Sequence, residues 1–394
     1  MEQFRPTRAV IHLEHLAHNI RELRKAVGSQ VFFCPMVKAN GYGHGDIDIA
    51  LRLDKEGVRH LGVGLIEEGK LLRENGIKAD LLFFGTFDER GVKTLVENNL
   101  IPVLSTWDQI HALENFLSAS NEPYPVHVKF DTGMHRLGFS LGDLQPLVAH
   151  FSNSRGKNTK LKLCGILTHL HSGEDAGDLR GQSFEQLRLF QIVEKVFAHF
   201  KPVSHTLNSA GLLNFLAHQT KVLPHDISST QGVRPGLAIY GLAPQAPTKF
   251  QLKPVMSLRS ETVKYHLVKK GEGVSYNQTW TAPQDSVIAV IPIGYADGYH
   301  RLLSNKAEVL FRGARVPLVG NVCMDYLMID ITKTLKNEIA QSLKPEAVTL
   351  FGQDSFGNEI SALELAQKAQ TISWEILTSV GERVPRVPVS EAMR

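Results

Sequence analysis

Two patterns of apolar residues alternate along the chain as far as residue 241. Short continuous apolar runs between turn residues are typical of buried strands, and apolar residues spaced three or four apart indicate helices. The predicted strands span 9–13, 31–38, 60–65, 80–85, 100–105, 126–131, 162–169, 203–208 and 233–240. The predicted helices span 14–27, 67–75, 88–98, 107–118, 141–151 and 182–199.

From residue 31 onward these segments form eight β/α steps, in roughly the length that a (β/α)8 barrel of the TIM type requires. Crossover helices between consecutive strands make such a sheet parallel. Pro35 and Pro102 fit this prediction least, because a proline has no N–H group to donate inside a sheet. The predicted fold class is therefore α/β, with the barrel at the N-terminus.

The pattern changes after Gly241, where residues 243–247 are typical of a linker. The later predicted strands span 255–268, 286–293, 307–311, 315–319, 326–331 and 347–351, and the later helices span 361–369 and 373–378. Short strands with glycine-rich turns indicate a compact β domain. We therefore predict a barrel over residues 1–243 and a mostly-β domain over residues 244–394, with the first ~10 residues as candidates to pack with the β domain.

The composition is ordinary for a soluble enzyme, with 43% hydrophobic and 21% charged residues among 394. The net charge of +3 gives no strong field for nucleic acid or anionic lipid, and no apolar run reaches membrane-spanning length.

Three scattered cysteines argue against a disulfide framework or a cysteine-based zinc site. For a second possible metal site, at His171, Glu174 and Asp175, a solvated loop is the preferred interpretation, and we predict no metal. The N-terminal residues contain no apolar segment of a signal peptide, so we expect a cytoplasmic protein.

One lysine, Lys38, ends an apolar run and precedes a glycine-rich stretch that finishes at Gly45. A lysine at a strand end is usually an exposed surface residue. Here three glycines let main-chain N–H groups approach a ligand, and Tyr42 adds a hydroxyl donor. This arrangement suits an amine that binds an aldehyde cofactor covalently.

Further polar residues lie at the predicted ends of later strands, where barrel enzymes place their active sites. They are Lys129, Asp131, His169, Asn208, Ser209 and Arg234. One such residue alone is more often structural, but several on one predicted rim indicate a site. Ser209 and the turn at Gly236 and Leu237 suit a phosphate group.

The β domain contains two more candidate stretches, at residues 292–299 and 320–325. An Asp-Gly pair marks a turn, and a tyrosine beside glycine packs many loops. From spacing alone, a structural role for Tyr295 is therefore the preferred interpretation.

Five stretches, in the same order along the chain, resemble the motifs of the alanine racemases. They are residues 37–45, 129–138, 234–236, 294–298 and 323–325. The first resembles the pyridoxal-phosphate attachment motif of that family, and the resemblance covers nearly the whole chain. It implies a homodimer in which the barrel of one subunit and the β domain of its partner complete each active site.

The resemblance implies interconversion of L-alanine and D-alanine with pyridoxal 5'-phosphate, which supplies D-alanine for peptidoglycan. It implies that Lys38 holds the cofactor and is the base on the D face of the substrate, and that Tyr295 of the partner subunit is the base on the L face. Racemisation needs two bases on opposite faces of one Cα. The reference pKa of tyrosine is about 10, so nearby positive charge would have to help it. The other implied cofactor residues are Tyr42, Arg136, His169, Asn208, Ser209, Arg234, Gly236, Leu237 and Tyr240.

The implied position of Arg234, facing the pyridine nitrogen, is chemically informative. A carboxylate there would keep that nitrogen protonated and the ring a strong electron sink. An arginine cannot accept the proton, because its pKa exceeds about 12. This favours a racemase over an aminotransferase or decarboxylase. The implied substrate residues are Arg136, Met324 and Asp325, with the Met324 N–H group as the direct contact on the partner.

Two positions carry separate expectations. In some members of the family the lysine that matches Lys129 is carbamylated, and a carbamate would pair with Arg136 where two plain cations would repel. Some members also have a tyrosine at the position of Glu382, near the phosphate and the entrance. A carboxylate would repel a phosphate, so we assign Glu382 no cofactor role.

Three other functions are compatible with parts of the pattern. A broad-specificity amino-acid racemase shares every motif, although those we know of are often exported. A barrel-type decarboxylase of basic amino acids shares the two-domain plan, but Arg234 and the Tyr295 motif argue against it. A non-enzymatic cofactor carrier built from the same barrel would lack residues 244–394.

Overall fold

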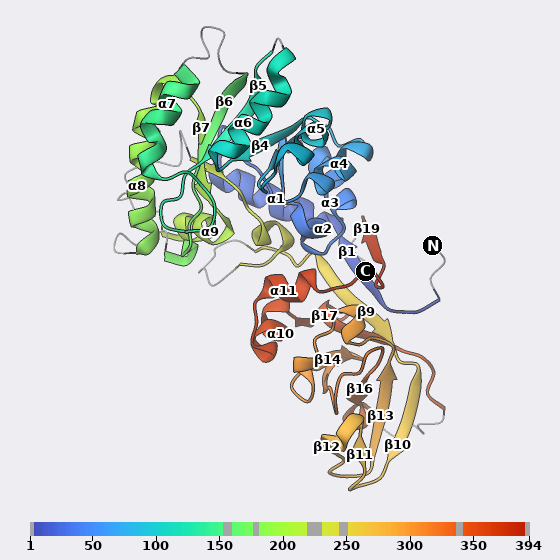
Figure 1. Cartoon of the computed structure of the whole chain (residues 1–394). Coiled ribbons are helices and arrows are strands. Elements are labelled where there is room, and N and C mark those ends of the chain that lie inside the picture. The colour runs from blue at the N-terminus through green and yellow to red at the C-terminus, as the bar shows by residue number, and fades with distance from the viewer. Residues whose placement is uncertain are drawn as a thin grey trace. The chain divides into compact units, whose positions relative to one another are not determined.

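The structure is a computed structural model that describes residues 4–120, 122–152, 160–175, 181–218, 231–243, 251–335 and 342–390. The chain forms two compact units (Figure 1). The barrel unit comprises Ala17–Gly41 and Asp46–Lys253, and the β unit comprises Met1–Leu16, Tyr42–Gly45 and Pro254–Arg394. The predicted linker lies outside the described residues from position 244 onward, so the boundary between residues 243 and 244 stays a prediction.

The barrel unit contains a sheet of parallel strands in chain order. The strands are β2 (His60–Val63), β3 (Asp80–Phe83), β4 (Leu100–Leu104), β5 (Tyr124–Lys129), β6 (Leu161–Leu167), β7 (Val203–Leu207) and β8 (Gln231–Val233). Pro102 lies in β4 opposite Phe83 of β3, and pairing of β4 with β5 begins only at the next residue, Val103. The predicted parallel α/β barrel is confirmed.

The first predicted strand, 31–38, is wrong as a continuous strand. Phe33 makes a single parallel bridge to Val233 of β8, and Met36 makes one to Gly62 of β2. Pro35 interrupts the ladder between these bridges, because it has no N–H group to donate. The two bridges still join the first and last strands of the sheet and close the barrel.

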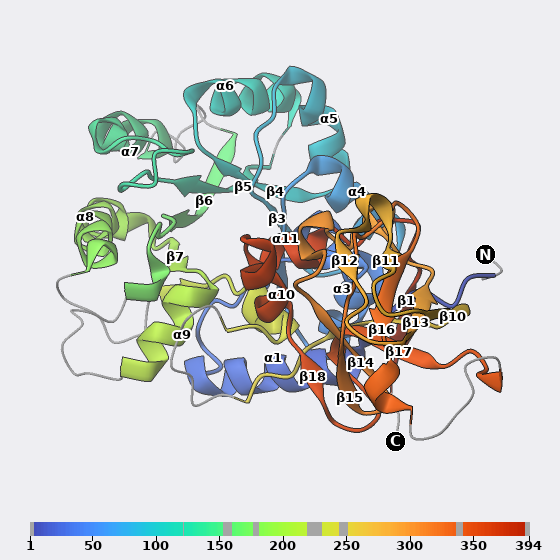
Figure 2. The same cartoon turned by 90° about the horizontal axis from the view of Figure 1, so that it is seen from below.

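Helices cover the outer side of the strands. The helices of this region are α1 (Leu13–Val27), α3 (Asp46–Lys55), α4 (Ile66–Glu74), α5 (Glu89–Glu97), α6 (Trp107–Phe116), α7 (Leu144–Ser152), α8 (Gln182–Phe197) and α9 (Ser209–His218). The segment labelled α2 (Lys38–Tyr42) is a turn of left-handed backbone. Figure 2 shows α5 to α9 arranged around the strands β3 to β7. Phe130 after β5 packs with Phe190 and Phe197 of α8 in a buried cluster, so the apolar face of the helix covers the sheet.

The predicted strand 233–240 is wrong beyond its first residue. The strand β8 ends at Val233, and a 3₁₀ helix, η6, occupies Leu237–Tyr240. Pro235 and Gly236 separate the two, because the proline cannot continue the ladder. The predicted strand 255–268 is likewise two strands, β9 (Met256–Glu261) and β10 (Lys264–Val268), which belong to different sheets.

The described residues of the β unit form three sheets. The largest has the order β15-β14-β17-β9-β1-β19, with β18 paired to β17; the smaller ones are β10-β13-β16 and β11-β12. The bounds are β1 (Arg8–His12), β11 (Gly273–Val274), β12 (Trp280–Thr281), β13 (Ser286–Ile291), β14 (Glu308–Phe311), β15 (Ala314–Pro317), β16 (Leu327–Asp330), β17 (Ala347–Gln353), β18 (Glu359–Ile360) and β19 (Arg386–Val389). The helices α10 (Ala362–Ala369) and α11 (Ser373–Thr378) complete it. The first strand, β1, pairs antiparallel with β9 and parallel with β19, so residues from both ends of the chain share one sheet.

Candidate active site

Several predicted site residues of the barrel unit lie at one end of the sheet. Lys129 is the last residue of β5, and Arg234 directly follows β8. His169 comes shortly after β6, Asn208 directly follows β7, and Lys38 follows the bridged segment that closes the barrel. The carboxyl ends of parallel strands share one edge, which we call the barrel rim.

The charges of these side chains act on one another, which shows that they lie close together. Desolvation and then the charges of Arg136 and Arg234 lower the pKa of the Lys129 amine to about 8. Desolvation lowers the pKa of Lys38, and Arg136 lowers it further. Desolvation and then Arg234 hold the pKa of His169 well below its ordinary value. A neutral amine is a better nucleophile, so this cluster of cations favours reactive lysines.

Lys38 opens a short turn of left-handed backbone. The φ angles of Ala39, Asn40, Gly41 and Tyr42 lie between 53° and 59°. The Gly41 N–H group donates to the Val37 carbonyl at 2.9 Å and closes the turn. Such backbone costs about 1–2 kcal/mol for each residue that is not glycine, so the surrounding structure must hold it.

Arg234 is buried and fixed by four hydrogen bonds. Its Nη1 group donates to the Nδ1 atom and the carbonyl of His205 at 2.8 and 2.5 Å, and its Nη2 group donates to the carbonyls of Thr168 and Thr206 at 2.7 and 3.3 Å. Within the described ranges, Nε–H is the donor of Arg234 that has no such bond. Desolvation lowers the pKa of Arg234 only to about 10, so it stays a cation at neutral pH.

A chain of two buried histidines lies behind Arg234. Because His205 accepts from Arg234 at Nδ1, its proton is on Nε2, from which it donates to Nδ1 of His127 at 2.8 Å. Desolvation lowers the pKa of His127 to about 3 and, with Arg234, holds that of His205 well below its ordinary value. Both rings are therefore neutral, and they fix the orientation of the guanidinium without adding charge.

The turn after β8 is joined to the start of α9. The hydroxyl of Ser209 accepts from the N–H groups of Gly236 and Ala238 at 2.8 and 3.1 Å. Leu237 begins η6, so its N–H group points out of the start of a helix. The Tyr240 hydroxyl donates to the Met36 carbonyl at 3.0 Å and ties this turn to the segment before Lys38.

Asn208 is committed to local structure. It accepts from the Gly211 N–H group at 2.9 Å and donates to the Leu170 carbonyl at 3.3 Å.

Tyr42 is assigned to the β unit, where its carbonyl accepts from Nδ1–H of His44 at 2.9 Å and its side chain is buried.

The loop that carries Arg136 is shaped by the residue at its start. The Asp131 carboxylate accepts from the N–H groups of Gly133 and His135 at 2.9 and 3.1 Å. Gly138 has a φ of 132°, and a Cβ there would lie 2.7 Å from the Asp131 nitrogen. The loop therefore requires glycine at this position, and the exposed Arg136 side chain projects from a fixed backbone.

The two candidate stretches of the β unit are joined to each other. The N–H groups of Tyr295 and Ala296 donate to the carbonyls of Cys323 and Met324 at 3.0 and 3.1 Å. A Cβ at Gly294 would lie 2.2 Å from the Cys323 oxygen, so only glycine permits this approach. The side chains of Tyr295 and Met324 are 42% and 53% exposed, so both are available to a ligand or partner.

A buried carboxylate, Asp297, anchors this pair of stretches. It accepts two hydrogen bonds from Arg5, at 2.8 and 3.0 Å, and one from the Gly294 N–H group at 3.0 Å. Asp325 instead accepts from Arg383 at 2.6 Å. Arg5, Asp297 and Arg383 were not predicted as site residues, although Asp297 lies in an Asp-Gly turn and in the motif of residues 294–298.

Other sequence candidates lie outside this arrangement. Asp175 accepts from the N–H groups of Gln182 and Ser183 at 2.8 and 3.2 Å and so caps α8. Glu382 is exposed in the β unit, where its charge acts on Arg386. Among the described residues there is no metal-binding group of three or more acidic, histidine or cysteine side chains, and no helix long and apolar enough to cross a membrane.

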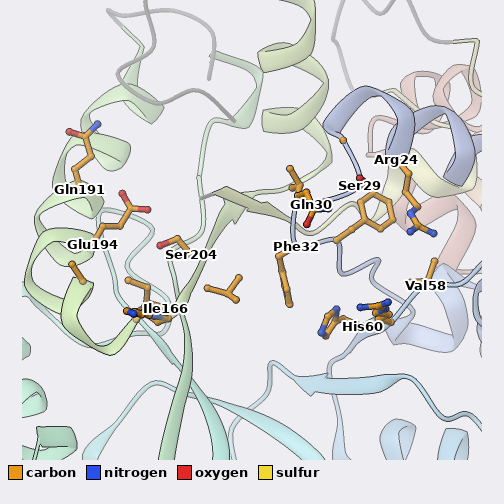
Figure 3. Close-up of a pocket in the computed structure, with 18 of the residues that line it drawn as sticks. Arg24, Ser29, Gln30, Phe32, Val58, His60, Ile166, Gln191, Glu194 and Ser204 are labelled. Carbon is orange, nitrogen blue, oxygen red and sulfur yellow. The ribbon is translucent and has the colours of Figure 1, made fainter. Parts of the chain in front are cut away.

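A pocket of about 1050 Å³ lies at the other end of the barrel unit (Figure 3). Its lining includes Phe32, His60 and Val203, and the last two are the first residues of β2 and β7. It therefore opens at the amino ends of the strands, away from the barrel rim.

The chain combines a closed (β/α)8 barrel with a mostly-β unit, and the barrel has a cluster of lysines at its rim. These features define a class of two-domain barrel enzymes. Comparisons with known proteins identify the family. Residues 11–244 match the family model "Alanine racemase, N-terminal domain", and residues 255–388 match "Alanine racemase, C-terminal domain". The chain belongs to the alanine racemase family and is an isomerase.

Individual relatives are similar over almost their whole length. The alanine racemase of Sorangium cellulosum (strain So ce56) is 37% identical over 393 residues, which cover 97% of this chain and 98% of the relative. The structure of the alanine racemase from D-cycloserine producing Streptomyces lavendulae has a TM-score of 0.86 at 26% identity and covers 99% of each chain. That from Bartonella henselae, with covalently bound pyridoxal phosphate, has a TM-score of 0.83 at 29% identity and covers 98% of this chain and 99% of its own.

The lowered pKa of Lys129 leads to a testable prediction. Its amine should be protonated below about pH 8 and neutral above it, whereas the reference value for lysine is about 10.4. Carbon-13 NMR of the reductively methylated protein in buffer free of carbon dioxide should show one resonance with a midpoint near pH 8. The variant Lys129→Met should remove that resonance; a midpoint of about 10 would contradict the prediction.

Proposed function

We propose that this chain interconverts L-alanine and D-alanine with pyridoxal 5'-phosphate held on Lys38. The observation that carries the proposal is Arg234, a buried cation with one donor unused by the described residues and two neutral histidines behind it. A guanidinium facing the ring nitrogen cannot give up its proton, which disfavours strong delocalisation of charge into the ring. That supports racemisation over decarboxylation.

The residues of the barrel rim suit this cofactor. Lys38 offers an amine of lowered pKa to the aldehyde, and Nε–H of Arg234 suits the ring nitrogen. The N–H group of Leu237, at the start of η6, suits the phosphate, whereas the Gly236 N–H group already donates to the Ser209 hydroxyl. When bound, the cofactor would acidify the Cα–H group of the substrate by withdrawing electrons from it.

The two-base assignment goes further than the family membership. We assign Nζ of Lys38 to hold the Cα proton on the D face, and the Tyr295 hydroxyl of a second subunit to hold it on the L face. One base removes the proton, and the other delivers one from the opposite side. The exposure of Tyr295 and its fixed backbone suit a residue presented to a partner, which supports a homodimer with shared sites.

Arg136 and Met324 are the proposed contacts of the substrate carboxylate. Arg136 is exposed, and its charge acts on both lysines of the rim. Among the described residues, the Met324 N–H group makes no main-chain hydrogen bond, so it is free to donate to a carboxylate. Asp325 is better understood as the partner of Arg383, because a second carboxylate would repel the substrate.

Two finer alternatives remain to be separated by experiment. A broad-specificity racemase would act on serine or lysine as well as alanine, and a decarboxylase would release carbon dioxide. Optical rotation of each amino acid, with carbon dioxide measured in parallel, distinguishes them. A cytoplasmic location and the supply of D-alanine for peptidoglycan are predictions from the family resemblance.

We also propose that Lys129 carries a carbamate. A neutral amine adds to carbon dioxide and releases a proton, and a pKa of about 8 leaves much of Lys129 neutral near that pH. The resulting anion would pair with Arg136, whose charge otherwise opposes that of the lysine.

The carbamate can be tested by mass and by structure. Native mass spectrometry in bicarbonate should show the added mass of one carbon dioxide, which should be absent from Lys129→Met. Electron density at high resolution should show a planar group on Nζ. An unmodified amine in both experiments would refute the carbamate.

Replacement of Lys38 tests the core of the proposal. Lys38→Ala should abolish covalent attachment of pyridoxal phosphate and reduce racemisation about 100-fold or more in both directions, because both the anchor and a base are lost. Chiral chromatography measures the second effect. The control is Lys70→Ala, an exposed lysine on α4, which should behave as wild type. Retained covalent cofactor in Lys38→Ala would refute the assignment.

Tyr295→Phe tests the second base. Turnover should fall about 100-fold or more in both directions, because the enantiomers have equal free energy and a single barrier limits both. Proton exchange should nevertheless be one-sided. In deuterium oxide, D-alanine should exchange its α-proton with retention through Lys38, while L-alanine should not, as proton NMR would show. Tyr326→Phe, at an exposed tyrosine of the same unit, is the control; equal exchange of both enantiomers would argue against two bases.

A further inference from the structure

The carboxylate of Glu68 joins two separate segments of the barrel unit. Its Oε1 atom accepts from the Ala39 N–H group at 2.6 Å. Its Oε2 atom accepts from the N–H groups of Gly64 and Leu65 at 2.7 and 3.1 Å. Glu68 lies in the first turn of α4, so one side chain connects the start of that helix to the residue directly after Lys38.

The two bonds on Oε2 have a local explanation, but the bond to Ala39 does not. A glutamate in the first turn of a helix often accepts from the N–H groups just before the helix. Ala39 is 29 positions earlier in the chain, so capping of α4 does not require that contact. The contact uses the other oxygen of the carboxylate and is the shortest of the three.

The segment that Glu68 holds is the left-handed turn of residues 39–42. The Gly41 N–H group of this turn donates to the carbonyl of Val37, which precedes Lys38. Three of its residues are not glycine, so the turn needs an external restraint to persist. Glu68 supplies one at Ala39, where the turn begins.

The stem of Lys38 lies against the second segment. A Cβ at Gly64 would stand 3.4 Å from both Cβ and Cδ of Lys38, which is ordinary packing distance. Glu68 therefore fixes the backbone on both sides of that stem, at Ala39 and at Gly64. Its negative charge also raises the pKa of Lys38 against the effects of desolvation and Arg136.

We propose that Glu68 is a positioning residue, which holds the left-handed turn against the start of α4 and so aims the Lys38 amine at the aldehyde of the cofactor. This inference rests on the proposed function, in which Lys38 captures the aldehyde of pyridoxal phosphate with loss of one water. Glu68 acts through the backbone of Ala39 and Gly64 and does not itself touch the cofactor.

The test compares capture of pyridoxal phosphate by cofactor-free Glu68→Gln and Glu67→Gln. Glu67 is an exposed neighbour in the same helical turn, so its replacement removes the same charge from α4. The rate is measured from pH 6 to 11 by borohydride trapping and mass spectrometry. An amide cannot accept at both of its ends, so Glu68→Gln should lower the plateau at high pH at least tenfold. Its midpoint should move to lower pH, because the charge that raises the Lys38 pKa is gone.

A second variant separates the effect of side-chain length at position 68 from the effect of charge. Glu68→Asp keeps the carboxylate but is one methylene shorter, so it should lower the plateau while its midpoint stays close to that of wild type. It also keeps the test available if Glu68→Gln does not fold. Plateaus within twofold of wild type in the folded variants would overturn the proposal.

Amide hydrogen exchange makes this test independent of the proposed function. The Ala39 amide should exchange at least tenfold faster in the Glu68 variants than in wild type and Glu67→Gln. A wild-type protein that captures no cofactor would refute the proposed function, whereas unchanged exchange at Ala39 would refute the role of Glu68.

Discussion

The barrel closes through a strand that cannot be regular, and the position of the reactive lysine depends on that closure. Phe33 and Met36 each make a single bridge, to the last and the first strand of the sheet, with Pro35 between them. The irregular segment still has to satisfy its polar groups, and it does so by bonding to both neighbours. Because those bonds finish at Val37, the next residue, Lys38, leaves the sheet at the rim and begins the left-handed turn.

The barrel rim gathers several positively charged side chains that repel one another. Desolvation lowers the pKa of both Lys38 and Lys129, and neighbouring cations lower it further: Arg136 acts on both lysines, and Arg234 acts on Lys129. Such a cluster is unfavourable without anions. In the proposed function the anions are a phosphate, a substrate carboxylate and a carbamate, so the empty protein would be the least balanced state. The protein itself supplies a nearby carboxylate, Glu68, whose charge favours protonation of Lys38.

The sequence predicted those parts of the site that depend on local order along the chain. Strand ends follow from apolar runs and turn residues, so Lys129, Asn208 and Arg234 could be placed on one rim in advance. Of the two prolines that fitted the predicted barrel least, Pro35 does interrupt its strand, whereas β4 forms despite Pro102. Side chains that act over long separations gave no such signal. Glu68 bonds to Ala39, and Arg5 bonds to Asp297, across 29 and 292 positions, and neither pairing follows from periodicity.

Each unit, by its own hydrogen bonds, restrains the backbone around the proposed site residues that it contributes. In the barrel unit, Glu68 restrains the turn after Lys38, and Asp131 restrains the loop of Arg136. In the β unit, the paired bonds from Arg5 to the buried Asp297 restrain the turn of Tyr295. Because these groups are already ordered in the separate units, assembly of a site costs less conformational entropy. In the proposed function, a site shared between subunits could then place its two proposed bases, Lys38 and Tyr295, accurately even though they belong to different units.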